Sequence, residues 1–378
     1  MEAQLIAFYA ALVILGIDAV LVAALISLKA IHRRRSRRHA ERRAAYLDVL
    51  THHLNYRNST HPIGRDAADD PAFLDALIDV RDALAGPEVD TLAGIIERYD
   101  IAEHQEARLR TRFPLGRRLR AAVVLAEIGD EGSADALMEH LSDREPEIRI
   151  QAARGLRQMG WTPAIDAIVD RFSIESPWVR SRFSDILSGY GPKATWPLVA
   201  YVRVNHRFEI DGPVAAIRTL GRIGDREAGP PLLDLLTEAD QPEIEVALIS
   251  ALGRIGGPEA LLPLAGTAQD EDWRLRAETA TALGTIGAPD AIPVLAELLE
   301  DRNWWVRRNS AAALARIPGG VAALYQALGS DDRFARDAAA ESLTDAGELI
   351  AARRHADDGN ADERELALLA HMSAGGAA

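Results

Sequence analysis

Three arginines near the middle of the chain have the residue type and spacing of an anion-binding patch. Arg218 and Arg222 are four residues apart, one turn along a helix, and Arg254 follows further along the chain. A guanidinium group holds carboxylates and phosphates through paired hydrogen bonds. We therefore expect these arginines to receive an acidic peptide or a phosphate group from a partner, and a solvated helix surface is the alternative interpretation.

Four tryptophans form a second set, because each stands just before a recurring pair of an apolar residue and an arginine. They are Trp178, Trp273, Trp304 and Trp305. Exposed tryptophans are frequent anchors of protein interfaces, whereas a large ring can also close the end of a helix pair. Both roles stay open, and Trp178, Trp273 and Trp305 are candidate partner-binding residues.

Patterns that carry catalysis or bind metal ions are close to absent. The sequence has no cysteine, no Gly-rich phosphate loop, no nucleophile elbow and no pair of histidines at metal-ligand spacing on a helix. His52 and His53 are adjacent and therefore face different directions on a helix. We expect no enzymatic activity, no cofactor and no metal ion.

A series of glycines places these residues on repeated helical hairpins. The glycines recur at nearly constant spacing, at Gly129, Gly160, Gly191, Gly224, Gly256 and Gly287. Each follows a helical segment such as residues 275–286 and precedes a second apolar segment such as residues 291–299. Glycine ends a helix because it accepts the left-handed backbone conformation. The pattern predicts an all-α solenoid, in which neighbouring hairpins share one core.

One arginine also recurs near the start of the helix that ends at the glycine. These arginines are Arg118, Arg149, Arg180, Arg276, Arg307 and Arg336. Asp143, Asp270 and Asp301 each precede such an arginine by six residues, a spacing that lets carboxylate and guanidinium join helix ends and neighbouring repeats. Two consecutive units depart from this pattern, since Pro213 and Glu245 occupy the arginine position.

These features resemble the HEAT-like repeat family, whose bacterial members use the same Val-Arg, Ala-Ala, Leu-Gly and Ile-Gly pairs. The resemblance extends from about Arg117 to Gly347 and is closest to the short-period repeats also found in phycobilisome lyases. It implies a superhelix of paired helices that binds other macromolecules, with the arginine-bearing helices on the concave side. HEAT-like hydroxylases that hold iron use repeated His-Glu pairs, and this sequence has none in that order.

The N-terminal segment predicts a membrane anchor. Residues 5–28 contain one charged residue, Asp18, and such a helix is long enough to cross a hydrocarbon layer of about 30 Å. A carboxylate at mid-membrane is costly, so Asp18 is a candidate intramembrane contact, although one tolerated acid is the alternative. The basic residues that follow would stay on the cytoplasmic side and contact lipid headgroups. They include Arg33, Arg34, Arg35, Arg37 and Arg38.

By pattern the chain divides into an anchor (1–30), a basic juxtamembrane helix (31–60), a linker (61–70), N-terminal capping helices (71–116), repeats (117–347) and a C-terminal cap with a tail (348–378). Residues 1–50 carry a formal charge of +4 and the remainder −18. Nucleic acids are poor partners for such an acidic solenoid.

The sequence therefore predicts a scaffold or adaptor that binds a protein partner, located at the inner membrane as a single-pass protein. Its N-terminus would face outward and its solenoid would lie in the cytoplasm. An accessory subunit of a membrane complex, such as a glycosyltransferase or transporter, is one alternative. From the enzyme class, the alternative is a factor similar to phycobilisome lyases.

Overall fold

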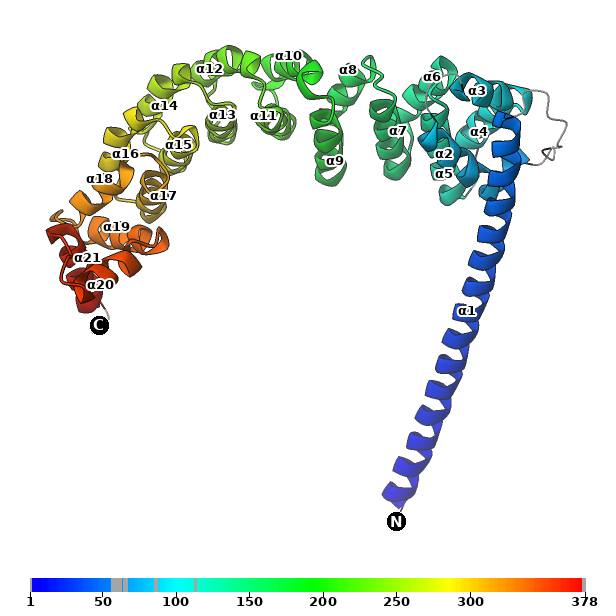
Figure 1. Cartoon of the computed structure of the whole chain (residues 1–378), viewed down its shortest axis with the longest axis horizontal. Coiled ribbons are helices and arrows are strands. Elements are labelled where there is room, and N and C mark those ends of the chain that lie inside the picture. Colours follow the sequence, from blue (N-terminus) through cyan, green and yellow to red (C-terminus); the bar gives the residue numbers. More distant parts are fainter. Residues whose placement is uncertain (1, 56–62, 64–66, 85–87, 112–113, 376–378) are drawn as a thin grey trace. The chain divides into compact units, whose positions relative to one another are not determined.

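In the computed structural model, the backbone is described for residues 2–55, 63, 67–84, 88–111 and 114–375. Side chains are described for the same ranges without residues 2–20, 23, 82, 90, 374 and 375. Every regular element in these ranges is a helix (Figure 1), which confirms the all-α class. The chain forms two compact units, unit 1 (Met1–Gly155) and unit 2 (Leu156–Ala378), and each is described by itself.

Unit 1 is built around the C-terminal part of its long first helix. Its helices are α1 (Glu2–Asn55), α2 (Pro71–Ala83), α3 (Glu88–Arg98), α4 (Ile101–Arg110), α5 (Leu115–Ile128), α6 (Glu131–Glu139) and most of α7 (Pro146–Gln158). Leu50 of α1 and Phe73 of α2 are fully buried. The Tyr46 ring packs edge-on against Phe73, with 5.3 Å between ring centroids. The end of α1 is therefore part of the core of this unit.

Polar contacts hold α1 against α2 as well. Asp70 caps α2 by accepting the Ala72 N–H at 3.0 Å, and its carboxylate also accepts the Tyr46 hydroxyl at 2.9 Å and pairs with Arg42. One turn further along α2, Asp75 lies 2.8 Å from a ring nitrogen of His39. The part of α1 that follows residue 38 is thus joined to the folded unit by packing and by charge.

The predicted membrane anchor needs correction. Within the residues that the structure describes, no helix is both long and apolar enough to cross a membrane. The single-pass inner-membrane location, with its N-terminus outward and its solenoid in the cytoplasm, is contradicted by this finding.

The residues linked to that prediction are affected in different ways. The side chain of Asp18 lies outside the described residues, as does half of the predicted linker at 61–70. The five arginines predicted to meet lipid headgroups lie exposed on α1, and that contact remains a prediction. They are Arg33, Arg34, Arg35, Arg37 and Arg38.

Unit 2 consists of two rows of helices. The outer row contains α8 (Ala164–Val169), α10 (Thr195–Asn205), α12 (Gly229–Glu238), α14 (Leu261–Thr267), α16 (Ile292–Leu298) and α18 (Gly320–Ala327). The inner row contains α9 (Pro177–Ser188), α11 (Asp211–Ile223), α13 (Pro242–Ile255), α15 (Trp273–Ile286), α17 (Trp304–Leu314) and α19 (Arg333–Asp345). Figure 1 shows the inner row on the concave side of this unit, and α20 (Glu348–Asp357) and α21 (Glu363–Gly375) end the chain.

The ends of the inner helices follow from local sequence. Asp272 caps α15 by accepting the backbone N–H of Arg274 at 2.9 Å. Gly287 ends the same helix with φ of +73°, and its N–H bonds to the Leu283 carbonyl. All six glycines of the predicted series have positive φ, and the predicted role at helix ends is confirmed for Gly129, Gly224, Gly256 and Gly287, which are the C-caps of their helices.

The inner helices approach one another closely because small residues face each other. A methyl group added at Gly253 of α13 would lie 2.7 Å from the Cα of Ala282 in α15. One added at Gly284 of α15 would lie 2.8 Å from the Cα of Ala313 in α17. We call these contacts the glycine–alanine seam, which also includes Gly221 of α11, where an added methyl would lie 2.9 Å from the Cα of Ala251.

The recurring arginines join successive repeats. Arg276 donates to the Asp270 carbonyl at 2.8 Å in its own repeat, and to both carboxylate oxygens of Asp301 in the next repeat at 2.6 and 2.9 Å. Both side chains are more than nine-tenths buried. Arg118 and Asp143 form the same kind of buried pair between successive repeats. We call this series of arginines the arginine ladder, and its predicted role between repeats is confirmed at these two positions.

Candidate functional site

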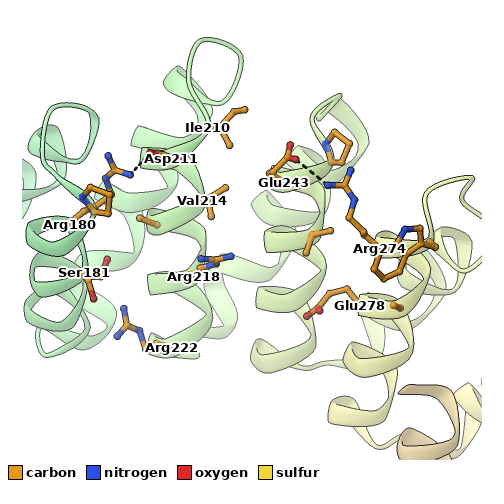
Figure 2. A pocket seen from close by; sticks show the side chains of 17 residues that line it. Arg180, Ser181, Ile210, Asp211, Val214, Arg218, Arg222, Glu243, Arg274 and Glu278 are labelled. Atoms are coloured by element: carbon orange, nitrogen blue, oxygen red, sulfur yellow. Dashed lines mark hydrogen bonds and ion pairs between the residues drawn. The ribbon is translucent and has the colours of Figure 1, made fainter. Parts of the chain in front are cut away.

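A groove on the concave side of unit 2 crosses four inner helices, α9, α11, α13 and α15. Its volume is about 710 Å³, and Figure 2 shows the side chains that line it. The wall formed by α9 and α11 carries Arg180, Arg218 and Arg222, and Glu278 lies on α15. Between them the lining is mainly apolar. We call this space the concave groove.

Two of the three predicted arginines line the concave groove. Arg218 and Arg222 extend from successive turns of α11, and both are exposed. Arg254 is also exposed but is not part of the lining, and its side chain packs near Gly221 of the preceding inner helix. The structure thus brings Arg218 and Arg222 together at one site and leaves Arg254 outside it.

Ion pairs hold most of the charged side chains of the concave groove. Arg180 of α9 pairs with Asp211 of α11 at 3.1 Å, and Arg274 of α15 pairs with Glu243 of α13 at 3.2 Å. Both pairs are drawn in Figure 2. Arg222 pairs with Asp185 of α9. These pairs connect neighbouring helices across the groove walls.

The tryptophans lie at the first turns of inner helices and are partly exposed. Trp178 is 50%, Trp273 40% and Trp305 49% exposed. Trp273 lines the concave groove, whereas Trp178 and Trp305 do not. Trp304 packs edge-on against Trp305, with ring centroids 4.7 Å apart. A partly exposed ring beside the apolar groove residues Val214, Pro242 and Val246, which we call the apolar floor, suits a protein interface. Such a ring offers a large contact area at little entropic cost.

In the first repeat that lacks the recurring arginine, where Pro213 occupies its position, a different network of polar side chains is present. Tyr201 donates its hydroxyl to Glu209 at 2.6 Å, and Ser173 donates to the same carboxylate oxygen at 2.5 Å. Gly212 gives this tyrosine room, since a methyl group there would lie 2.2 Å from its hydroxyl oxygen. Residues 211–213 therefore accommodate Tyr201 where other repeats place an arginine.

In the second repeat that lacks the arginine, Glu245 occupies its position. Two acidic side chains, Glu245 and Asp270, therefore stand where other repeats pair an arginine with an aspartate. Glu245 and Asp270 have the same separation along the sequence as Arg276 and Asp301. Burial, and then the charges of Asp270, Asp240 and Asp272, raise the pKa of Glu245 above its usual value. The two departures border the groove, since α11 and α13 are the helices that carry them.

At the intact position the shift has the opposite sign. Burial alone would raise the pKa of Asp301, but the hydrogen bonds from Arg276 and from the Asn303 N–H, together with the charge of Arg276, hold it below its usual value. This carboxylate is therefore stabilised in its charged form by the arginine ladder.

Sequence reasoning did not identify Glu278 or the apolar floor. Glu278 stands two residues after Arg276, a position that holds Arg182 and Asn309 in other repeats, so the repeat pattern does not distinguish it. Among the side chains that the structure describes, no group of three or more histidine, aspartate or glutamate residues is arranged to hold a metal ion.

Comparison with known proteins agrees with this architecture. The profile of a family described as HEAT repeats matches residues 106–187, 207–277 and 262–344, which together make up more than half of the chain. The chain therefore belongs to the HEAT repeat family. A search of curated proteins gives no match, and the resemblance to phycobilisome lyases gains no support.

Two solved karyopherin structures have a similar fold at low sequence identity. The karyopherin Kap121p is 12% identical with a TM-score of 0.51, and the match covers 81% of this chain and 38% of Kap121p. Kap121p bound to the SUMO protease Ulp1p is 14% identical with a TM-score of 0.50, covering 74% and 38%. Human deoxyhypusine hydroxylase in complex with glycerol is 23% identical over 68% of this chain and 98% of that chain, with a TM-score of 0.30.

Proposed function

We propose that this chain is a scaffold or adaptor that binds another protein through the concave side of unit 2. The observation that carries the proposal is the concave groove, which lies where the arginine ladder is interrupted. Arginine and tryptophan, both enriched at protein interfaces, stand at its walls.

The shape of the concave groove favours a protein segment as the ligand. It extends over four successive inner helices, whereas sites for small molecules are usually enclosed and bury most of the ligand. Its floor includes Val214, Pro242 and Val246, which offer apolar contact without a polar group that would select one small molecule. Among the described residues, no observation favours the two alternatives, a factor similar to phycobilisome lyases and an accessory subunit of a membrane complex.

The test compares protein partners captured by the full-length chain and by two matched tryptophan variants. Trp273→Ala removes a ring that lines the concave groove, and Trp178→Ala removes a similarly exposed ring outside it. Quantitative mass spectrometry should show a partner reduced about tenfold or more by Trp273→Ala and unchanged by Trp178→Ala. A third variant, Val246→Glu, places a charge on the apolar floor and should deplete the same partner. Identical partner sets for all four proteins would refute the proposal.

A further inference from the structure

The charged residues that line the concave groove differ in whether their side chains are held in ion pairs. Seven charged side chains line it, and five of them are held in the ion pairs described above. Within the described part of the chain, Arg218 and Glu278 have no ion pair or hydrogen bond of their side chains. One is positive and the other negative, so the groove presents two opposite charges that the protein itself leaves without partners.

These two charges lie on opposite sides of an apolar strip. Arg218 belongs to α11 and Glu278 to α15, and Figure 2 shows them on either side of the helix that carries Glu243. The helix between them, α13, lines the groove with Pro242, Glu243 and Val246, and apart from Glu243, which is paired with Arg274, this strip is apolar. A ligand that reaches both charges must therefore cross this apolar strip.

The spacing of the helices sets the length of such a ligand. Neighbouring packed helices have axes about 8–10 Å apart, so α11 and α15 are separated by roughly 16–20 Å. An extended chain advances about 3.3 Å per residue. Five or six residues of extended peptide span the distance between the two helix axes, which is an upper limit for the distance between the two charges, because the Glu278 side chain extends towards α13 (Figure 2).

We infer that the concave groove binds an extended peptide segment with an acidic residue at Arg218 and a basic residue at Glu278, on the other side of the apolar strip and up to six positions away. This inference rests on the proposed function and adds the chemistry of the partner. A purely acidic segment would place a carboxylate against Glu278, and a purely basic one would place a cation against Arg218. The residues between the two charges are apolar or small, because they cross the strip at Val246.

Synthetic peptides test the spacing directly. The first probe is a dye-labelled peptide with glutamate and lysine six positions apart and leucine and serine between them. The second has the same composition with glutamate and lysine adjacent. Fluorescence anisotropy with the full-length protein should show the spaced probe binding at least fivefold more tightly. Equal binding of the two probes, or no binding of the spaced probe at millimolar protein, overturns the inference.

Charge reversals in the concave groove test the orientation without depending on loss of binding. Arg218→Glu makes both ends of the strip acidic and should shift the preference to a probe with lysine at both positions. Glu278→Arg makes both ends basic and should shift it to a probe with glutamate at both positions. Arg254→Glu is the matched control, because it reverses a charge outside the lining, and its preference should equal that of the wild type. The inference is overturned if Arg218→Glu does not prefer the probe with two lysines and Glu278→Arg does not prefer the probe with two glutamates.

The outcomes separate this inference from the proposed function. If Trp273→Ala and Val246→Glu deplete a captured partner while the charge reversals leave probe preference unchanged, the scaffold proposal stands and the dipolar peptide is wrong. If the variants leave every captured partner in place, the proposed function itself fails.

Discussion

The helices α15 to α17 and the helices α11 to α13 have the same backbone arrangement but different charge arrangements. In the first region, Arg276 and Asp301 form a buried pair between repeats. In the second, Pro213 replaces the arginine in one repeat and Glu245 faces Asp270 in the next. The comparison indicates that the repeats fold without the arginine ladder at every position.

The largest expected effect comes from breaking the intact region. Arg276→Ala leaves the buried Asp301 carboxylate without its partner and should destabilise the protein by about 3–5 kcal/mol. The shift is measured as the midpoint of urea unfolding followed by circular dichroism. Arg218→Ala removes an exposed arginine without an ion pair within the described residues, and should change stability by less than about 0.5 kcal/mol. Similar losses of stability in Arg276→Ala and Arg218→Ala would contradict the distinction between a buried, paired arginine and an exposed one without an ion pair.

A smaller change, an increase in stability, is expected when an arginine is introduced at the interrupted position in α13. Glu245→Arg replaces a repulsion by an attraction to Asp270 and should stabilise the protein by about 0.5–1 kcal/mol. Glu245→Gln removes only the repulsion and serves as the control, with a smaller gain. If Glu245→Arg lowers the unfolding midpoint, the arginine ladder cannot simply be extended through α13.

The smallest effect is a difference in pH dependence. Because the native pKa of Glu245 is raised above its usual 4.5, its contribution to stability is present below that pH and lost as pH rises through the native pKa. The pKa of Asp301 is lowered from 3.8, so its contribution is present above that value and lost as pH falls. Unfolding midpoints from pH 3 to pH 7 should decline less steeply above pH 4.5 in Glu245→Gln, and less steeply at the acid end in Asp301→Asn. Parallel curves for wild type and both variants would contradict these assignments.

Features that depend on neighbouring residues were predictable from the sequence. The glycine series determines helix ends through backbone conformation, and the arginine and aspartate spacing reports contacts between adjacent repeats. The concave groove was not predictable, because it depends on the curvature of several repeats together. Arg254 illustrates the limit, since it occupies the same repeat position as Arg222 but does not line the groove. The interruption of the arginine ladder was visible in the sequence, yet its alternative network around Tyr201 was not.

The glycine–alanine seam has a mechanical consequence for the concave groove. Backbone atoms already meet along α11, α13, α15 and α17, and packed protein interiors are hardly compressible. Separating these helices loses contacts gradually, whereas pushing them together meets hard repulsion at once. The inner helices are therefore already at their minimum spacing. The groove can widen to admit a large ligand, but it cannot narrow around a small one.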